Sequence, residues 1–455
     1  MNQDKDVVII GCGAGGGTAA QFARKTNRKA KITIFEKDRY PQYSKCGLPY
    51  VISGEIPNIL DLIEFNENWF KKTNIDLLLE TTVEKINVNK QIVYAKKGNN
   101  SIEKHYDSLI ICTGAKPSIP DIQDFKTGGV FAVRTIDDAK KISSFVKKDG
   151  HATIIGAGLI GLEMADSLRK KGMRITVVEA LHRVLANNLD EDIAKIVTER
   201  IPDDITVFTN HHVTSVKSKN GKISKVIIKN NNLNEEKEID SDLLIIATGT
   251  KPNVELAKSI DCKIGVTGGI IVNNQCETNV KDVYAVGDCS EYLDFVTAKP
   301  ISIGLGSVVV RQGIAAGVNA AGGNYELFKG VLNTCTSKFF GVEIAAVGPT
   351  INGMNNDFSV VTGRFNGFSL PGYYPGGKPV SIKVSVDKYT GMIMGAQCVG
   401  DKAAQRINTF ACAIIGELDI ETLRKLETAY APPLAPTLDA VTLVCDIISM
   451  KLKRK

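Results

Sequence analysis

The most regular feature of the chain is a short apolar run followed by a glycine-rich turn and a segment with helical periodicity. Residues 7–10 read V-V-I-I, which is typical of a parallel strand buried on both faces. The turn G-C-G-A-G-G follows, and then residues 18–25 have a helical pattern with small side chains on one side. A second apolar run, residues 32–35, ends at Glu36. The pattern predicts strand, loop, helix and strand in that order.

This order of elements predicts a dinucleotide-binding unit. Gly11, Gly13 and Gly16 form a G-x-G-x-x-G motif, whose glycines permit a tight turn and the close approach of a pyrophosphate to the helix N-terminus. Glu36 stands where a carboxylate can accept a hydrogen bond from a ribose hydroxyl. The bare motif is weak evidence, but here the strands, the helix and the acid also fall where the mechanism needs them.

The same pattern occurs once more in the chain. Its parts are, in order, the strand 152–155, the glycines Gly156, Gly158 and Gly161, the helix 162–171, the strand 175–178 and the acid Glu179. Two dinucleotide sites in one chain imply transfer of electrons or hydride between two cofactors. The alternative is a duplicated fold in which one site is inactive.

Glu179 also bears on the choice of electron donor. A carboxylate at the end of the second strand suits the 2′-hydroxyl of NADH and repels the 2′-phosphate of NADPH. His182 and Arg183 follow closely, however, and a nearby arginine can reverse this preference. We therefore expect NADH and keep NADPH as the alternative donor.

Length, composition and charge place the chain among soluble globular proteins. Its 455 residues are too many for one ordinary core and suggest about three domains. The net charge of +6 is small for this size, and the basic C-terminal cluster is typical of a solvated tail, so we expect no nucleic acid partner. No signal peptide precedes the first strand, and no apolar stretch approaches the roughly 20 residues that cross a bilayer. We expect a cytoplasmic protein that does not bind membranes.

The cysteines direct attention to one position. The chain has 10 cysteines with no C-x-x-C pair, so neither a metal site nor a disulfide framework is predicted. Cys46 lies in the turn-rich segment Y-S-K-C-G-L-P-Y, which follows the first dinucleotide unit. A thiolate near a nucleotide site indicates redox chemistry, favoured by a positive or helix-terminal environment. The alternative is a small buried apolar residue.

Three further segments carry a resemblance to a known family. Residues 109–115, L-I-I-C-T-G-A, and residues 244–250, L-I-I-A-T-G-T, resemble the paired segments that close each nucleotide domain of two-dinucleotide flavoproteins. Residues 278–289, T-N-V-K-D-V-Y-A-V-G-D-C, resemble the second flavin motif of these proteins. Over nearly its whole length the chain resembles the pyridine nucleotide-disulfide oxidoreductases. The resemblance implies bound FAD and cofactor-binding positions at Thr113, Gly114, Gly249, Gly287 and Asp288, with Asp288 on the ribityl chain.

Within this family the chain resembles the branch that uses a single cysteine. Position 41 is proline and position 51 is valine, so neither position completes a C-x-x-x-x-C motif with Cys46. The last histidine is His212, so the C-terminal half lacks the histidine of the two-cysteine disulfide reductases. The remaining relatives are coenzyme A disulfide reductases, NADH-dependent persulfide reductases, NADH oxidases and NADH peroxidases.

Two C-terminal segments resemble the coenzyme A and persulfide members. These are G-Y-Y-P-G-G at residues 372–377 and A-Y-A-P-P at residues 429–433. In coenzyme A disulfide reductase the matching tyrosines reach the active site of the partner subunit, which implies catalytic roles for Tyr373 and Tyr430 and a homodimer with shared active sites. A phenol, with an ordinary pKa near 10, can protonate a departing thiolate at neutral pH. The alternative for both tyrosines is interface packing.

The chain also departs from its relatives close to Cys46. Coenzyme A disulfide reductases usually have serine and asparagine where this chain has Gln42 and Lys45, so coenzyme A is only one candidate substrate. Lys45 is assigned to the cofactor site, and its positive charge next to Cys46 favours the thiolate. The first glycine-rich loop lacks the histidine of NADH oxidases and peroxidases, which counts against peroxide chemistry.

These observations predict an α/β protein with two Rossmann-like domains and an α+β dimerisation domain. The expected domains are FAD-binding residues 1–115 and 250–323, NAD(P)H-binding residues 116–249 and C-terminal residues 324–455. Electrons are expected to pass from NAD(P)H through FAD to Cys46, which reduces a coenzyme A disulfide, a persulfide or a polysulfide. The alternatives are an NADH oxidase with oxygen or sulfur as acceptor and a redox-sensing flavoprotein with a binding role.

Overall fold

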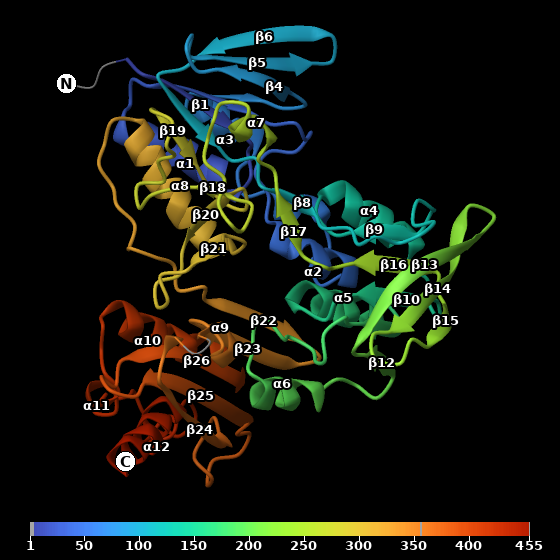
Figure 1. Ribbon diagram of the computed structural model, residues 1–455, viewed down its shortest axis with the longest axis vertical. Coiled ribbons are helices and arrows are strands. Elements are labelled where there is room, and N and C mark those ends of the chain that lie inside the picture. The colour runs from blue at the N-terminus through green and yellow to red at the C-terminus, as the bar shows by residue number, and fades with distance from the viewer. Residues whose placement is uncertain (1–3, 355–356, 455) are drawn as a thin grey trace. The chain divides into compact units, whose positions relative to one another are not determined.

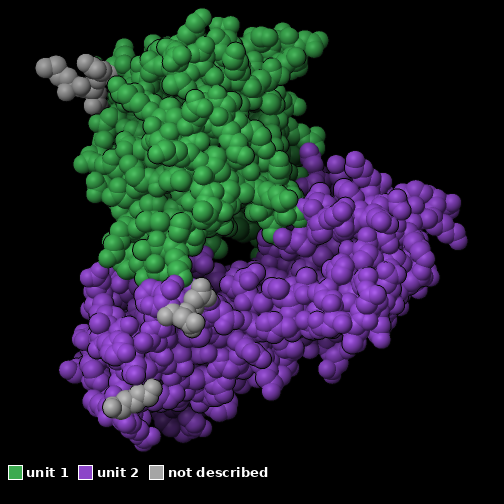
Figure 2. Space-filling model, viewed as in Figure 1, with its two compact units in different colours: residues 1–118, 134–136, 249–331 green, residues 119–133, 137–248, 332–455 purple. Residues whose placement is uncertain are grey.

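The computed structural model describes residues 4–354 and 357–454. The chain forms two compact units, coloured green and purple in Figure 2. Unit 1 contains residues 1–118, 134–136 and 249–331, and unit 2 contains residues 119–133, 137–248 and 332–455.

Unit 1 is built around a parallel sheet with the strand order β19-β7-β1-β2-β3. The two apolar runs that begin the chain form β1 and β2 of this sheet. Strand β1 pairs in parallel with β2 on one side and with β7 on the other. Its strands are β1 (Asp6–Ile10), β2 (Lys31–Phe35), β3 (Ile75–Leu78), β7 (Ser108–Ile111) and β19 (Val283–Ala285).

Two helices of unit 1 pack closely against each other beside this sheet. They are α1 (Ala14–Thr26), which follows the first glycine-rich loop, and α8 (Gly306–Ala320). Figure 1 shows them side by side. A Cβ atom at Gly317 would lie 2.3 Å from the carbonyl oxygen of Ala19, so only glycine allows this approach. The contact fixes α1, and with it the glycine-rich loop at its N-terminus.

The remaining elements of unit 1 are short. Antiparallel strands form the sheet β4-β5-β6, and a further small sheet has the order β18-β20-β21. The ribbon of β8 and β17 lies where the chain passes from unit 1 to unit 2 and returns. The bounds are β4 (Thr82–Asn87), β5 (Ile92–Lys97), β6 (Asn100–His105), β8 (Ala115–Pro117), β17 (Thr250–Pro252), β18 (Ile270–Ile271), β20 (Ser290–Leu293), β21 (Pro300–Ser302), η1 (Lys45–Gly47), α2 (Leu48–Ser53), η2 (Ile59–Leu62), α3 (Glu67–Lys72) and α7 (Glu255–Lys258).

The first half of unit 2 repeats the parallel sheet with the order β12-β11-β10-β16-β9. An antiparallel meander, β13-β14-β15, shares an apolar core with this sheet, and this core includes Val178, Val226 and Leu244. The elements are β9 (Val130–Ala132), α4 (Ile136–Phe145), β10 (His151–Ile155), α5 (Leu159–Lys170), β11 (Arg174–Val178), α6 (Glu191–Thr198), β12 (Ile205–Phe208), β13 (His211–Lys219), β14 (Lys222–Asn230), β15 (Glu236–Asp240) and β16 (Leu243–Ile246).

The second half of unit 2 is an antiparallel sheet with the order β22-β23-β26-β25-β24, accompanied by helices. Helix α12 packs on β24 and β25, as Figure 1 shows. The elements are β22 (Cys335–Phe339), β23 (Val342–Val347), α9 (Ile351–Met354), β24 (Val360–Phe368), β25 (Pro379–Asp387), β26 (Ile393–Gly400), α10 (Ala403–Ile415), α11 (Ile420–Leu423) and α12 (Ala440–Lys453).

Polar contacts tie the two halves of unit 2 together. Lys383 on β25 lies 2.9 Å from a carboxylate oxygen of Asp190 and 2.7 Å from one of Asp192, near the start of α6. The hydroxyl of Ser337 on β22 donates to Glu163 on α5 at 2.5 Å. The helix that begins at the second glycine-rich loop is therefore anchored on the C-terminal sheet.

The predicted fold class is confirmed: two Rossmann-like domains and an α+β C-terminal domain are present. The predicted strands coincide with β1, β2, β10 and β11 within a residue at either end. Helices α1 and α5 begin earlier than predicted because their first turns include the last part of each glycine motif.

Candidate active site

The first glycine-rich loop has the geometry that its motif predicts. Gly11 has a φ of 102°, a conformation that favours glycine, and its amide donates to the carbonyl oxygen of Phe35 at 2.8 Å. A Cβ atom at Gly16 would lie 1.9 Å from the carbonyl oxygen of Gly11, whereas one at Gly13 would have no atom within 4 Å. Gly11 and Gly16 thus serve the turn, and Gly13 leaves space above the N-terminus of α1 for a pyrophosphate.

Glu36 lies at the end of β2 and is tied to the loop. One of its carboxylate oxygens accepts from the amide of Cys12 at 2.5 Å and the other from the amide of Asp38 at 2.9 Å. Burial raises the pKa of Glu36 above its ordinary value. A carboxylate has about four lone-pair positions, so it can hold both amides and still accept from a ribose hydroxyl. The residues present therefore fit the adenosine part of FAD.

Asp288, predicted at the ribityl chain, has a partner that the sequence did not indicate. Its Oδ2 lies 2.6 Å from Nη2 of Arg134, and both side chains are about one-fifth exposed. The Nε of Arg134 is buried and has no hydrogen-bond partner among the described residues. A buried donor without an acceptor fits an anionic ligand such as the diphosphate of FAD. Gly287 has a φ of 83°, and its amide donates to Gln312 at 2.9 Å.

Arg134 belongs to the short segment 134–136, where the chain returns briefly to unit 1. No motif marked it in the sequence, because its partner lies 154 positions away. The signal in the sequence that could have indicated it is a cationic residue in a segment that links the predicted domains.

The two other predicted cofactor segments have a clear structural role where the chain crosses between units. The hydroxyl of Thr113 donates to the carbonyl oxygen of Asn253 at 2.6 Å, and the Asn253 amide donates back to the Thr113 carbonyl at 2.9 Å. Gly114, with a φ of 64°, accepts from the backbone amide of Asn253, and the carbonyl of Gly249 accepts from Ser118. These residues hold the two crossing strands together beside the end of β7.

Cys46 lies in the 3₁₀ turn η1, directly before α2. The preceding segment is held by two backbone bonds, from Ser44 to the carbonyl of Leu62 at 2.8 Å and from Glu64 to the carbonyl of Gln42 at 3.0 Å. All 10 cysteines lie in the described residues, none of them forms a disulfide, and only Cys46 and Cys412 are exposed. Cys46 is therefore a thiol held at the surface of unit 1.

Lys45 belongs to the same group of charges as the cofactor residues. It is half-buried, and burial, together with the charge of Arg134, lowers its pKa, while Glu36 and Asp288 act in the opposite direction. Its ammonium lies 5.9 Å from the ring centre of Tyr43. Lys45 thus lies within electrostatic reach of Glu36 and Asp288, and its role at the cofactor stays a prediction.

Gln42, the other departure from the relatives, is turned inward. Its side chain is buried against α1, where a Cβ atom at Gly17 would lie 1.6 Å from Oε1 of Gln42. The carboxamide therefore packs on the helix that carries the first glycine-rich loop.

The second glycine-rich loop repeats the geometry of the first within unit 2. Gly156 has a φ of 100°, and a Cβ atom at Gly161 would lie 1.9 Å from its carbonyl oxygen. A Cβ atom at Gly158 would have no atom within 4 Å. Glu179 accepts from the amide of Ala157 at 2.6 Å. These residues fit the dinucleotide that the motif predicts.

The two predicted catalytic tyrosines meet on the surface of unit 2. Their hydroxyl oxygens are 2.7 Å apart, although Tyr373 and Tyr430 are separated by 57 positions in the sequence. Tyr373 is 72% exposed and Tyr430 is 47% exposed. The hydrogen bond to Tyr430 raises the pKa of Tyr373. Two loops thus present a phenol pair to the exterior of the chain.

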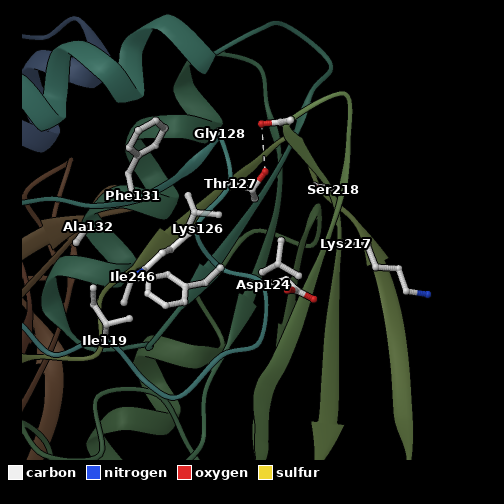
Figure 3. Close-up of a pocket in the computed structure, with 14 residues that line it drawn as sticks. Ile119, Asp124, Lys126, Thr127, Gly128, Phe131, Ala132, Lys217, Ser218 and Ile246 are labelled. Atoms are coloured by element: carbon white, nitrogen blue, oxygen red, sulfur yellow. Dashed lines mark hydrogen bonds between the residues drawn. The ribbon is translucent and has the colours of Figure 1, made fainter.

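Unit 2 also has an open pocket of about 970 Å³ between the segment 119–132 and the meander, which is shown in Figure 3. Phe125, Phe131 and Ile246 contribute apolar surface, and the hydroxyl of Thr127 donates to the carbonyl of Gly221 at 3.1 Å. None of the predicted site residues lines this pocket.

In residues 4–354 and 357–454, no three His, Cys, Asp or Glu side chains are placed together to hold a metal ion. No helix of that part is both long enough and apolar enough to span a bilayer.

The chain matches two family models. Residues 5–314 match the model of the pyridine nucleotide-disulphide oxidoreductases, and residues 334–441 match the dimerisation domain of these proteins. The family uses FAD and NAD(P)H.

Similar proteins of named activity match the chain over nearly its whole length. An NADH oxidase of Methanocaldococcus jannaschii is 37% identical over 98% of this chain and 99% of its own. A CoA-dependent NAD(P)H sulfur oxidoreductase of Pyrococcus furiosus is 34% identical, with coverage of 98% and 99%. The solved structure of a NAD-dependent persulfide reductase from A. fulgidus has a TM-score of 0.93 and 33% identity, and the match covers 98% of this chain and 84% of that one. The chain belongs to the pyridine nucleotide-disulphide oxidoreductase family.

Proposed function

We propose that this member of the family is a flavoprotein reductase that uses the thiol of Cys46 to cleave a sulfur–sulfur bond with electrons from NAD(P)H. The observation that carries the proposal is Cys46, an exposed thiol on the unit that contains the first glycine-rich loop. The similar sulfur oxidoreductase and persulfide reductase support sulfur as the acceptor.

Residues of both units supply the binding sites. Bound FAD would carry two electrons between the nicotinamide and the thiol. Gly13, Glu36 and Asp288 of residues 1–115 and 250–323 would hold it, with Lys45 and, from the segment 134–136, Arg134 as cations toward its diphosphate. Residues 116–249 would bind the nicotinamide dinucleotide at the second loop.

The chemistry of Cys46 begins with its thiolate. The thiolate attacks one sulfur of a substrate R–S–S–R′, so that a Cys46–S–S–R bond forms and R′S⁻ leaves with the electron pair of the broken bond. Two electrons from NAD(P)H then cleave the mixed disulfide, which restores the Cys46 thiolate and releases RS⁻. Each released thiolate takes up one proton.

Tyr373 and Tyr430 would supply protons in this scheme. We propose that they act at the active site of a partner subunit in a homodimer, which residues 324–455 would form. The exposure of the phenol pair and the match to the dimerisation domain support this role. A tyrosine phenol has an ordinary pKa near 10, so Tyr373 is protonated at neutral pH and can donate to a leaving thiolate.

The substrate would be a small disulfide, a persulfide or a polysulfide, with coenzyme A as one candidate carrier. Gln42 is buried on α1, so its carboxamide is not displayed for contact with a substrate. This favours sulfur compounds that need no contact at that position. A reaction of this kind fits a cytoplasmic location, because a reducing compartment keeps Cys46 as a thiol.

A Cys46→Ser variant tests the proposal, with Cys412→Ser as the matched control because Cys412 is the other exposed thiol. Both FAD-loaded variants are titrated with NADH without oxygen, and coenzyme A disulfide, coenzyme A persulfide and polysulfide are offered in turn. We expect turnover with the preferred acceptor to fall by about 10³-fold or more in Cys46→Ser and to persist in Cys412→Ser. Full turnover in Cys46→Ser with bound flavin would overturn the role of Cys46.

The second candidate function is that of an NADH oxidase, which the similar Methanocaldococcus jannaschii protein favours. Oxygen consumption with NADH alone, at a rate above that of any sulfur acceptor, would support it. Slow turnover with every acceptor, oxygen included, would instead favour a redox-sensing flavoprotein.

A further inference from the structure

The segment 180–189 follows Glu179 and folds back onto the second glycine-rich loop. The amide of Leu185 donates to the carbonyl oxygen of Ala157 at 2.9 Å, and the amide of Ala157 donates to Glu179 at 2.6 Å. The backbone of Ala157 is thus held from both sides, by the acid before the segment and by the segment itself. We call residues 180–189 the acid-following loop.

Arg183 ties the acid-following loop together from within. Its Nη1 donates to the carbonyl oxygen of Leu189 at 2.8 Å, and its Nη2 donates to that of Ala186 at 3.1 Å. The side chain is half-buried, and its Nε is buried without a hydrogen-bond partner among the described residues. Because both Nη atoms donate to carbonyl groups of its own loop, the guanidinium is held by the loop, although the sequence placed it as a candidate ligand of a 2′-phosphate.

The donors beside Glu179 are also occupied. The second carboxylate oxygen of Glu179 accepts from the amide of Leu181 at 2.8 Å, so Glu179 engages two backbone amides that could otherwise face an anion. The side chains displayed next to it include Ala180 and Leu181, which offer no donor, and Leu181 is 43% exposed. His182 is the exposed titratable side chain of the loop. Apart from His182, a 2′-phosphate would meet a carboxylate and side chains without a donor, whereas a 2′-hydroxyl could still donate to Glu179.

We infer that Arg183 is a positioning residue that holds the acid-following loop against the second glycine-rich loop, so that both NADH and NADPH depend on it for binding, and that it does not set the preference between them. The inference rests on the dinucleotide-binding half of the proposed function and not on its sulfur chemistry. It assigns Arg183 to the shape of the site and leaves recognition of the ribose to Glu179.

Binding of two adenosine fragments to the FAD-loaded protein tests the inference without turnover. ADP-ribose and its 2′-phosphorylated form are titrated by calorimetry into the wild type, Arg183→Met and Glu179→Ala. We expect the wild type to bind ADP-ribose about 100-fold more tightly than the 2′-phosphorylated form. Arg183→Met should weaken both ligands by about tenfold, because the loop loses two charge-assisted hydrogen bonds, and should leave their ratio unchanged. Glu179→Ala should move the ratio toward the phosphorylated ligand, because it removes the repulsion and releases two amides.

Selective loss of the 2′-phosphorylated ligand in Arg183→Met would overturn the inference, because it would show that Arg183 binds the phosphate. Unchanged binding of both ligands would overturn the positioning role. Arg183→Lys covers the case in which Arg183→Met does not fold: a lysine keeps the charge but cannot reach two carbonyl groups as a planar fork. If Arg183 positions the loop, Arg183→Lys should weaken the binding of ADP-ribose. If Arg183 instead binds the 2′-phosphate, Arg183→Lys should keep the affinity for both ligands. ADP-ribose has no redox chemistry, so a failure of the sulfur proposal would leave this result intact.

Discussion

The two glycine-rich loops have nearly the same backbone but different surroundings. Gly11 and Gly156 have φ values of 102° and 100°, and a Cβ atom at the last glycine of either motif would lie 1.9 Å from their carbonyl oxygens. At the fifth motif position the loops differ. Gly15 is buried, and a Cβ there would lie 2.7 Å from Cγ1 of Val286, whereas Ile160 is 49% exposed.

This difference suggests how one motif serves two kinds of cofactor. The first loop is covered by side chains of its own unit, which suits a group that remains bound. The second is open at the matching position, which suits a dinucleotide that must leave after each turnover.

The largest effect should come from alanine at the last glycine of each loop. Because the added Cβ atom would meet a carbonyl oxygen at 1.9 Å, backbone must move at a cost of about 3 kcal/mol or more. Gly16→Ala should yield protein without flavin absorbance. Gly161→Ala should retain FAD, but the rate at which NADH reduces the flavin should fall by about 100-fold. Dithionite should still reduce the flavin of this variant. A loss of flavin in Gly161→Ala that matched that in Gly16→Ala would remove the distinction between the loops.

Arg134→Met should have the next largest effect. Charge-assisted hydrogen bonds contribute about 2 kcal/mol, so the dissociation constant of FAD should rise by about 30-fold. The increase in flavin fluorescence when FAD leaves the protein measures this constant. Arg169→Met is the control, because its pair with Asp204 lies on the surface and contributes little. Equal FAD affinity in the wild type and Arg134→Met would show that Arg134 serves only Asp288.

Substitutions that change side-chain size can test whether Val286 packs over the first glycine-rich loop. Gly15→Ala should weaken FAD retention by about tenfold through contact with Val286, since overpacking costs about 1–3 kcal/mol. The double variant Gly15→Ala with Val286→Ala should recover part of this loss, because the contact is relieved. Ile160→Ala, at the matching position of the open loop, should leave FAD retention unchanged. Additive losses in the double variant would argue against direct packing as the cause.

The smallest effect concerns the pair of Tyr373 and Tyr430, which lies in unit 2 but outside both glycine-rich loops. The hydrogen bond raises the pKa of Tyr373, so this contact stabilises the pair below the ordinary tyrosine pKa of about 10 and is lost as pH rises through the higher value. Tyr430→Phe should move the titration of Tyr373 toward lower pH, as followed by phenolate absorbance. Tyr389→Phe, another exposed tyrosine, is the control. An unchanged titration would show that the pair does not persist in solution.

Sequence patterns predicted the two strand–loop–helix–strand units, the acids Glu36 and Glu179, and the single-cysteine character of the chain. Each depends on neighbours within a few tens of residues, because apolar runs, glycine turns and motif spacing act locally. The family and its cofactors followed from these patterns. The sequence also brought forward Tyr373 and Tyr430, but only through resemblance and without their contact.

Tertiary structure alone decided which polar groups meet. It paired Arg134 with Asp288, joined the two tyrosines, and turned Gln42 onto α1. It also directed Arg183 into its own loop, where the sequence left the direction of the side chain open. The physical reason is that a hydrogen bond or an ion pair depends on distances of about 3 Å, and these are set by packing between segments that sequence spacing does not relate.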